Sequence, residues 1–132
     1  MSNLPFPSNE NSLQSGHRLK SATELPWKRS HPNDPPLMMF QVHFFDGRVT
    51  SYAYSDLREV RLRDAGHLQL CLFGMEKYHV TIEGRNMIEL AELIGAGKMK
   101  SLMEMGPRTF ERAEQSPSID KVTIETLSGP AY

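Results

Sequence analysis

The stretch MFQVHFFDGRVTSYAY, residues 39–54, decides the fold because two runs of strand-forming residues flank a strong turn signal. Asp46-Gly47 is a dipeptide that favours a two-residue type I′ turn between antiparallel strands. The sequence therefore predicts a hairpin in which Phe45 faces Arg48. One face of this hairpin gathers most of the apolar side chains and is the better core candidate. The second face carries Met39, Gln41, His43, Phe45, Arg48, Thr50, Tyr52 and Tyr54.

Two further turn signals extend the hairpin into a meander. The Asp-Ala-Gly turn at 64–66 predicts a three-residue hairpin whose glycine has a positive φ, and the Gly-Met-Glu turn at 74–76 predicts the next hairpin. The register that keeps one face apolar places Leu70 opposite both Val60 and Val80. The predicted strands cover residues 39–45, 48–54, 59–63, 67–73 and 77–83.

One amphipathic helix follows the strands. Apolar residues recur at helical spacing over 87–94, and the glycines that follow end the pattern. Asn86 is the predicted N-cap, with Glu89 as its capping-box partner. The predicted fold class is α+β: an antiparallel β-meander of about five strands over 39–83, with this main α-helix packed on it.

Composition divides the chain into three parts. Residues 1–36 are rich in Pro, Ser and Asn and are predicted to be a flexible tail, because such a segment buries too little apolar surface to fold. Residues 37–112 are the predicted compact domain, in which 99–105 fits either a short helix or an edge strand. Residues 113–132 are a predicted C-terminal tail with a candidate late strand at 119–127.

Charge and composition exclude several classes of function. The 132 residues carry 15 basic and 16 acidic side chains, so the basic excess of a strong general polyanion binder is missing. Cys71 is the one cysteine, which rules out an intramolecular disulfide and favours a reducing compartment. Neither a secretory signal nor an apolar window of membrane-spanning length occurs in the sequence. We expect a cytoplasmic protein without a membrane partner.

A cross-strand row supplies the candidate catalytic residues. The predicted register places Glu59, Cys71 and His79 side by side, and a cysteine beside a histidine can act as a nucleophile or a weak metal ligand. An ordinary solvated sheet face is the favoured interpretation. No metal or cofactor is predicted, because the five histidines lack metal-ligand spacing and the glycines at 95–97 fail the phosphate-loop pattern.

Two other sets of residues are candidate binding sites. Tyr52 and Tyr54, with His43, Phe45 and Arg48, form a pattern typical of a stacking surface for single-stranded nucleic acid. Cover by the tails or by a second subunit is the favoured interpretation of that face. The second set is a predicted row of Arg63, His67 and Glu83 beside Arg61, which indicates cross-strand charge pairing or a specific anion site.

Trp27 is the one exception in the predicted N-terminal tail. It precedes two cations, Lys28 and Arg29, and tryptophan frequently anchors protein interfaces. A partner-docking motif is one interpretation. The alternative is that Trp27 folds back onto the domain's own aromatic face.

The leading hypothesis is a small non-catalytic protein-interaction or regulatory module that uses the second sheet face and the tails. Self-association as a homodimer is one form of it, since an edge strand can pair with another chain. A small-ligand or nucleic-acid-binding domain is the alternative, and a small enzyme using Cys71 and His79 is the third hypothesis. The candidate binding residues are Trp27, His43, Arg48, Tyr52, Tyr54, Arg61, Arg63 and His67.

Overall fold

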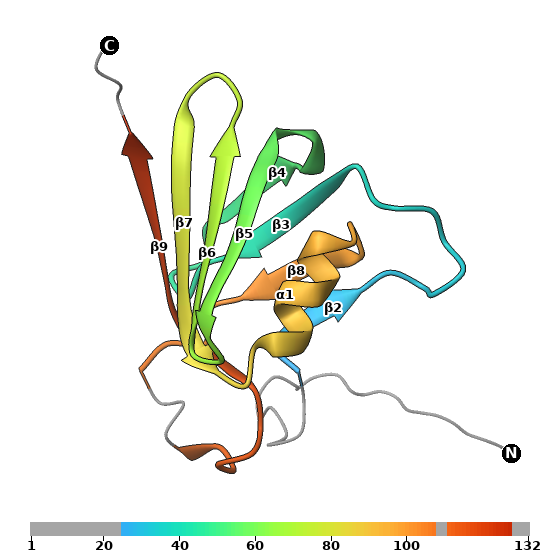
Figure 1. Ribbon diagram of the computed structural model, residues 1–132. Coiled ribbons are helices and arrows are strands. Elements are labelled where there is room, and N and C mark those ends of the chain that lie inside the picture. Colours follow the sequence, from blue (N-terminus) through green and yellow to red (C-terminus); the bar gives the residue numbers. More distant parts are fainter. Residues whose placement is uncertain (1–24, 108–110, 128–132) are drawn as a thin grey trace, which may run out of the picture.

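The computed structural model describes residues 25–107 and 111–127 and confirms the α+β class (Figure 1). Within these residues, eight strands form two four-stranded sheets, and one main helix, α1 (Ile88–Gly95), packs against them. Sheet 1 has the strand order β2 (Trp27–Arg29), β8 (Met99–Met103), β3 (Met39–His43) and β4 (Val49–Ala53). Sheet 2 has the strand order β5 (Leu57–Asp64), β6 (His67–Phe73), β7 (Lys77–Arg85) and β9 (Ser118–Leu127).

The predicted meander is divided between the two sheets. β3 and β4 form a hairpin of sheet 1, and the chain then passes through a 3-10 turn (Tyr54–Asp56) into β5 of sheet 2. The strands of the two sheets cross at an angle in Figure 1, and α1 contacts both β5 and β8. The core therefore lies between two sheets, with the helix at one side.

Apolar side chains from both sheets and from the helix fill this core. In β6 the alternate residues Leu68, Leu70 and Leu72 are fully buried, as the sequence pattern predicts. Each large apolar side chain that is fully buried contributes about 1.5–3 kcal/mol to folding. The remaining buried apolar residues are Trp27, Phe40, Val42, Phe44, Val80, Ile82, Met87, Leu90, Leu93, Ile94, Met99, Leu102, Ile119 and Val122.

The register of sheet 2 confirms the pairing predicted from the apolar pattern. Leu70 pairs with Val60 on one side and with Val80 on the other. The turn before β6 differs from the prediction, because Asp64 pairs with His67 and the register shifts just before Asp64. Gly66 has no positive φ there. A glycine is required at position 66 because a Cβ atom there would lie 2.8 Å from the carbonyl oxygen of Gly84.

The predicted type I′ turn at Asp46-Gly47 is wrong by one residue of register. His43 pairs with Val49, and the Phe44 N–H donates to the Arg48 carbonyl over 2.8 Å. The connection is a three-residue loop that ends on Gly47, whose φ of 98° suits a type I turn followed by a bulge. Asp-Gly fits both a two-residue type I′ turn and a three-residue loop with a type I turn and a bulge, so the dipeptide alone does not select the register.

This one-residue shift moves Tyr52 and Tyr54 from the second face into the core side of sheet 1. Tyr52 now pairs with Phe40, and their ring centroids lie 5.7 Å apart. The Tyr54 ring lies 4.9 Å from the Phe40 ring, and Tyr52 also makes an edge contact with Tyr78. Burial, followed by the neighbouring Tyr78, raises the pKa of Tyr52. The predicted aromatic stacking surface is therefore wrong.

Helix α1 begins without the predicted capping box. Met87 is its N-cap, with no side-chain cap hydrogen bond, and Asn86 has a positive φ of 55°. The Asn86 Nδ2 group donates to the carbonyls of Glu114 and Gln115, so this side chain ties down the segment before β9. Asn-x-x-Glu fits a capping box locally, but the long-range contact takes the asparagine away from the helix.

The predicted tail boundaries also need correction. Trp27 lies in β2 and is 4% exposed, so the ordered domain begins well before residue 37. The candidate late strand is confirmed as β9, but it pairs with β7 along almost its whole length and belongs to the domain. β8 confirms the strand alternative for 99–105, although it lies between β2 and β3 and is not an edge.

Replacing Tyr54 by phenylalanine is expected to destabilise the protein by about 1–3 kcal/mol, the cost of leaving buried polar groups unpaired. The Tyr54 hydroxyl donates to the carbonyl of buried Met99 over 2.7 Å and accepts the Met99 N–H over 3.1 Å. Urea unfolding measures the loss. Tyr78→Phe is the matched control, because the Tyr78 hydroxyl makes no hydrogen bond within the described residues, and an equal loss there would contradict this assignment.

The same tyrosine predicts an alkaline transition. Burial raises the pKa of Tyr54 from 10.0 to about 12, although its hydrogen bond to Met99 acts in the opposite direction. Because the folded-state pKa lies above the unfolded one, the neutral hydroxyl contributes stability that is complete below the unfolded value. This contribution is lost as pH rises through the folded value. Unfolding free energies measured between these two pH values should fall less steeply in Tyr54→Phe than in the natural sequence.

Candidate functional site

The outer face of sheet 2 brings the predicted catalytic row together. Glu59 pairs with Cys71, Cys71 with His79, and His79 with Glu125 of β9. Cys71 is a free, half-buried thiol. No hydrogen bond joins the Glu59, Cys71 and His79 side chains within the described residues, and no group of metal-ligating side chains is found there. The row is present, but these residues do not form a connected catalytic set.

The predicted charge row next to it is changed by the bulge in β5. His67 still pairs with Glu83 in β7, but its neighbour on the other side is Asp64, where Arg63 was predicted. The His67 Nδ1 atom lies 2.8 Å from Asp64 Oδ1, which also accepts the Gly66 N–H. The hydrogen bond from His67, followed by that from Gly66, lowers the pKa of Asp64.

A hollow of about 250 Å³ lies on this outer face, and the three residues of the predicted anion site all line it. The pairing of Arg61 with Gln69, and of Gln69 with Thr81, places the middle row of the face along the hollow. Its lining residues are Arg61, Arg63, His67, Leu68, Gln69 and Thr81.

The outer face of sheet 1 is a separate surface. Met39, Gln41 and His43 point to it because Phe40 and Val42, which alternate with them, are buried in the core. His43 Nε2 lies 3.1 Å from Gln41 Oε1 on this face.

A second hollow, of about 200 Å³, lies at the β2 side of sheet 1. Trp27 lines it and is otherwise buried, so the tryptophan packs against its own domain, but in the core beside β8 and not on the predicted aromatic face. The side chain is therefore not free to act as an extended docking motif. The Trp27 Nε1 atom is buried and has no hydrogen-bond partner within the described residues. The residues lining the hollow are Leu25, Pro26, Trp27, Lys28, His43, Ser101 and Met103.

Arg48 lies at the β3–β4 turn, away from both hollows. Its Nε atom is 2.8 Å from Asp46 Oδ2, and its guanidinium lies 4.4 Å from the centre of the Phe44 ring. The Arg48 backbone N–H, followed by its side chain, lowers the pKa of Asp46. The eight predicted binding residues therefore do not form one site.

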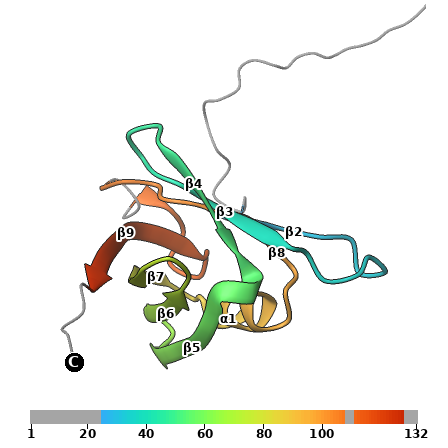
Figure 2. The same ribbon diagram turned by 90° about the horizontal axis from the view of Figure 1, so that it is seen from above.

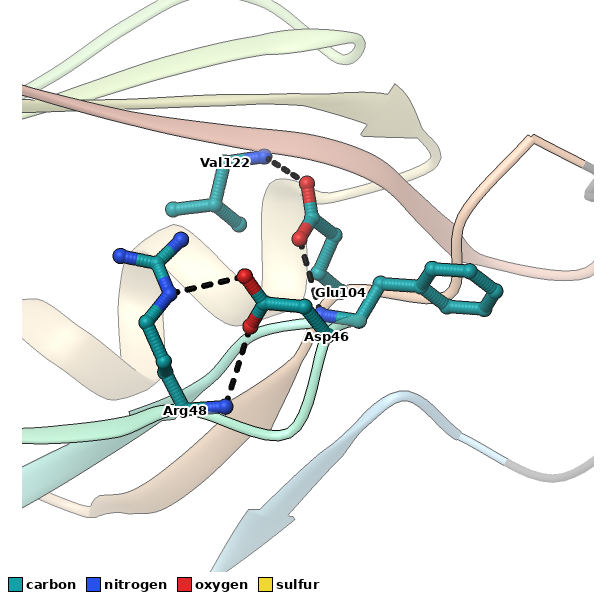
Figure 3. A network of polar contacts seen from close by, with 5 residues as sticks. Asp46, Arg48, Glu104 and Val122 are labelled. Atoms are coloured by element: carbon teal, nitrogen blue, oxygen red, sulfur yellow. Dashed lines mark hydrogen bonds and ion pairs between the residues drawn. The ribbon is translucent and has the colours of Figure 1, made fainter.

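Glu104 is a structural residue that sequence reasoning missed. Figure 3 shows its carboxylate between the two sheets, where Oε1 accepts the Phe45 N–H over 2.9 Å and Oε2 accepts the Val122 N–H over 3.0 Å. One side chain thus joins the β3–β4 turn of sheet 1 to β9 of sheet 2. Nothing local in the sequence marks this glutamate, because both of its partners are distant backbone groups.

Glu104→Ala is expected to destabilise the protein by about 1.5–3 kcal/mol, the usual value of hydrogen bonds made to a charged group. Urea unfolding of the variant measures this loss. Glu92→Ala is the control, because Glu92 is exposed on α1 and its loss should change stability by less than about 0.5 kcal/mol. Equal losses in both variants would show that the Glu104 bridge between the sheets contributes nothing.

Comparison with known proteins gives no assignment: no protein family, curated protein or solved structure matches this chain. Among the described residues, no helix combines the length and the apolar character needed to cross a membrane.

Proposed function

We propose that this chain is a non-catalytic protein-interaction module whose main binding surface is the outer face of sheet 1. The observation that carries the proposal is the exposed apolar surface on and beside that face. Met39 of β3 is 50% exposed, Val49 of β4 is 49% exposed, and the neighbouring Met38 is 85% exposed. Leu25, at the hollow beside Met103, is exposed as well. Contiguous exposed apolar surface marks interaction sites, and here Met39 and Val49 lie at the two ends of the β3–β4 pairing with Gln41 and Ser51 between them.

The position of the face supports this proposal. Figure 2 shows α1 and sheet 2 on one side of sheet 1, with no described helix or strand on the other side. Methionine side chains adapt their shape to different partners, which suits a binding surface. Gln41, Ser51 and Lys28 add polar groups among the apolar ones, as in the mixed surfaces that proteins use for recognition.

The two other functions have less support. Nucleic-acid binding loses its stacking platform, because Tyr52 and Tyr54 pack against Phe40. The catalytic hypothesis is supported only by the pairing of Cys71 with His79, because no hydrogen bond joins these side chains in the described part of the chain. A cytoplasmic location is part of the proposal, since a half-buried free thiol is compatible with a reducing compartment.

A capture experiment with paired variants tests the proposal. Full-length protein and its Met39→Glu/Val49→Glu variant are used as baits in lysate of the source cells, and retained proteins are identified by mass. A partner, or a second copy of this chain, should be retained by the natural sequence and lost from the variant. Met75→Glu is the control, because Met75 is 98% exposed in the loop between β6 and β7 of sheet 2. Retention that survives the double substitution would contradict the proposed surface.

A further inference from the structure

We infer that the hollow on the outer face of sheet 2 is a binding site for a single phosphate monoester group. It is independent of the proposed protein contact, because it lies on the other sheet. Strands β5, β6 and β7 supply all of its lining side chains. Paired strands hold these side chains at fixed spacings, which is the rigid support that a specific site requires.

The residues that line the hollow favour an anionic ligand. Five of its six lining residues have side-chain N–H or O–H donors, namely Arg61, Arg63, His67, Gln69 and Thr81, and the sixth is Leu68, whose side chain is buried in the core. No carboxylate is among them. Arginine guanidinium groups present paired donors that match the oxygens of a phosphate, and hydrogen bonds between such charged groups are stronger than neutral ones.

Two carboxylates beside the hollow, Glu59 and Asp64, hold its cations in place, and a third, Glu83, lies opposite His67 in β7. One oxygen of Glu59 accepts both Arg61 Nη2 over 2.7 Å and Arg61 Nε over 3.2 Å, so Nη1 is left for a ligand. Asp64 binds the Nδ1 side of His67, which leaves Nε2 as the ring nitrogen for a ligand. The Arg63 Nε atom forms an ion pair with Asp64 Oδ2 over 3.7 Å, which is beyond hydrogen-bond distance, so no hydrogen bond within the described residues occupies the Arg63 guanidinium.

Charge and size favour a phosphate monoester over a longer polyanion. Two guanidinium groups, each with a neighbouring carboxylate, present charged donors to a monoester, which carries a charge of about −1.5 to −2 near neutral pH. The chain as a whole has a net charge of −1, so a long nucleic acid would gain little attraction outside the hollow. The hydroxyl of Thr81 and the amide of Gln69 add neutral donors between the charged ones.

The experiment is a titration of the full-length, ¹⁵N-labelled protein followed by NMR at constant ionic strength. The probes are inorganic phosphate, O-phosphoserine, and a short phosphoserine peptide with its unphosphorylated counterpart. Saturable shifts are expected for amides around Arg61, Gln69 and Thr81. Arg61→Gln and Arg63→Gln should each weaken binding about tenfold, which corresponds to about 1.4 kcal/mol. Thr81→Val, which keeps the shape of the side chain, should weaken it less.

Arg58→Gln is the matched control, because Arg58 is a cation of the same strand that lies over the Phe73 ring and does not line the hollow. Equal affinity for phosphate and for the phosphopeptide would identify a small phosphorylated ligand, and tighter binding of the phosphopeptide would identify a modified protein. The inference is overturned if no probe gives saturable shifts. It is also overturned if Arg58→Gln weakens binding as much as Arg61→Gln, since the attraction would then be unspecific.

Discussion

A chain shortened to residues 37–112 is expected to be unfolded, whereas residues 25–127 are expected to fold cooperatively. The shorter chain lacks β2, with its buried Trp27, and β9, with buried Ile119 and Val122. Burial of these three side chains contributes about 1.5–3 kcal/mol each. A domain of this size has a total stability of only about 5–15 kcal/mol, so the loss of both strands removes most of it.

Circular dichroism and thermal unfolding of the two chains measure this difference. A cooperative transition is expected for residues 25–127 and a featureless melt for 37–112. The loss of β9 should matter more than that of β2, because nine residues of β9 pair with β7 and β2 is three residues long. A cooperatively folded 37–112 chain would contradict the assignment of these strands to the two sheets.

Gly84→Ala is expected to cost more than about 4 kcal/mol, a loss found at few single substitutions. A Cβ atom at Gly84 would lie 2.0 Å from the carbonyl oxygen of Ser118 and 2.9 Å from its carbonyl carbon. Both atoms belong to the backbone of β9, so relief of the clash requires the two strands to separate. The register between β7 and β9 also shifts at this point, which brings the backbones close together.

Gly95→Ala is the matched control for that substitution. A Cβ atom at Gly95 would meet nothing within 4 Å, and this residue ends helix α1. Alanine is favoured over glycine in helices by about 1 kcal/mol, so this variant should be as stable as the natural sequence or more so. Urea unfolding compares the two. A Gly84→Ala protein of natural stability would show that β7 and β9 are not paired in this register.

The pairing of β5, β6 and β7 in sheet 2 could be predicted because apolar alternation decides their register, whereas the pairing of β9 with β7 was not predicted. A slip of one residue would turn Leu68, Leu70 and Leu72 outward, so the pattern admits one pairing. The hairpin of sheet 1 lacks this constraint, since either register places strand-forming side chains on both faces. Asp46-Gly47 then fits two turn types, and the packing of Tyr52 against Phe40 and Tyr78 selects the one observed.

Long-range pairing explains the other differences. β2 has only three residues, so no periodicity marks it, and the residues of its partner β8 lie 70 or more positions further along the chain. β8 pairs in parallel with β3, a contact for which no turn signal exists. Asn86 and Glu104 bind backbone groups of distant segments, and such contacts leave no local pattern in the sequence.

The candidate sites divide in the same way. Arg61 and His67 were predicted to share one face, and they do, because the register between β5, β6 and β7 was predictable. The bulge before Asp64, which gives His67 its carboxylate partner, could not be predicted. A bulge depends on local backbone geometry more than on composition. The outer face of sheet 1 was predicted with Tyr52 and Tyr54 on it, and the structure replaces them with Val49 and Ser51.

Site-specific photo-crosslinking tests the central claim, that the outer face of sheet 1 contacts a protein partner. A photoreactive residue is placed in the full-length chain at Ser51, which is exposed on that face, or at Met75, which is exposed in a loop of sheet 2. After irradiation in the source cells, we expect a cross-linked protein from Ser51, identified by mass, and none from Met75. Cross-links from Met75 with none from Ser51 would contradict the claim.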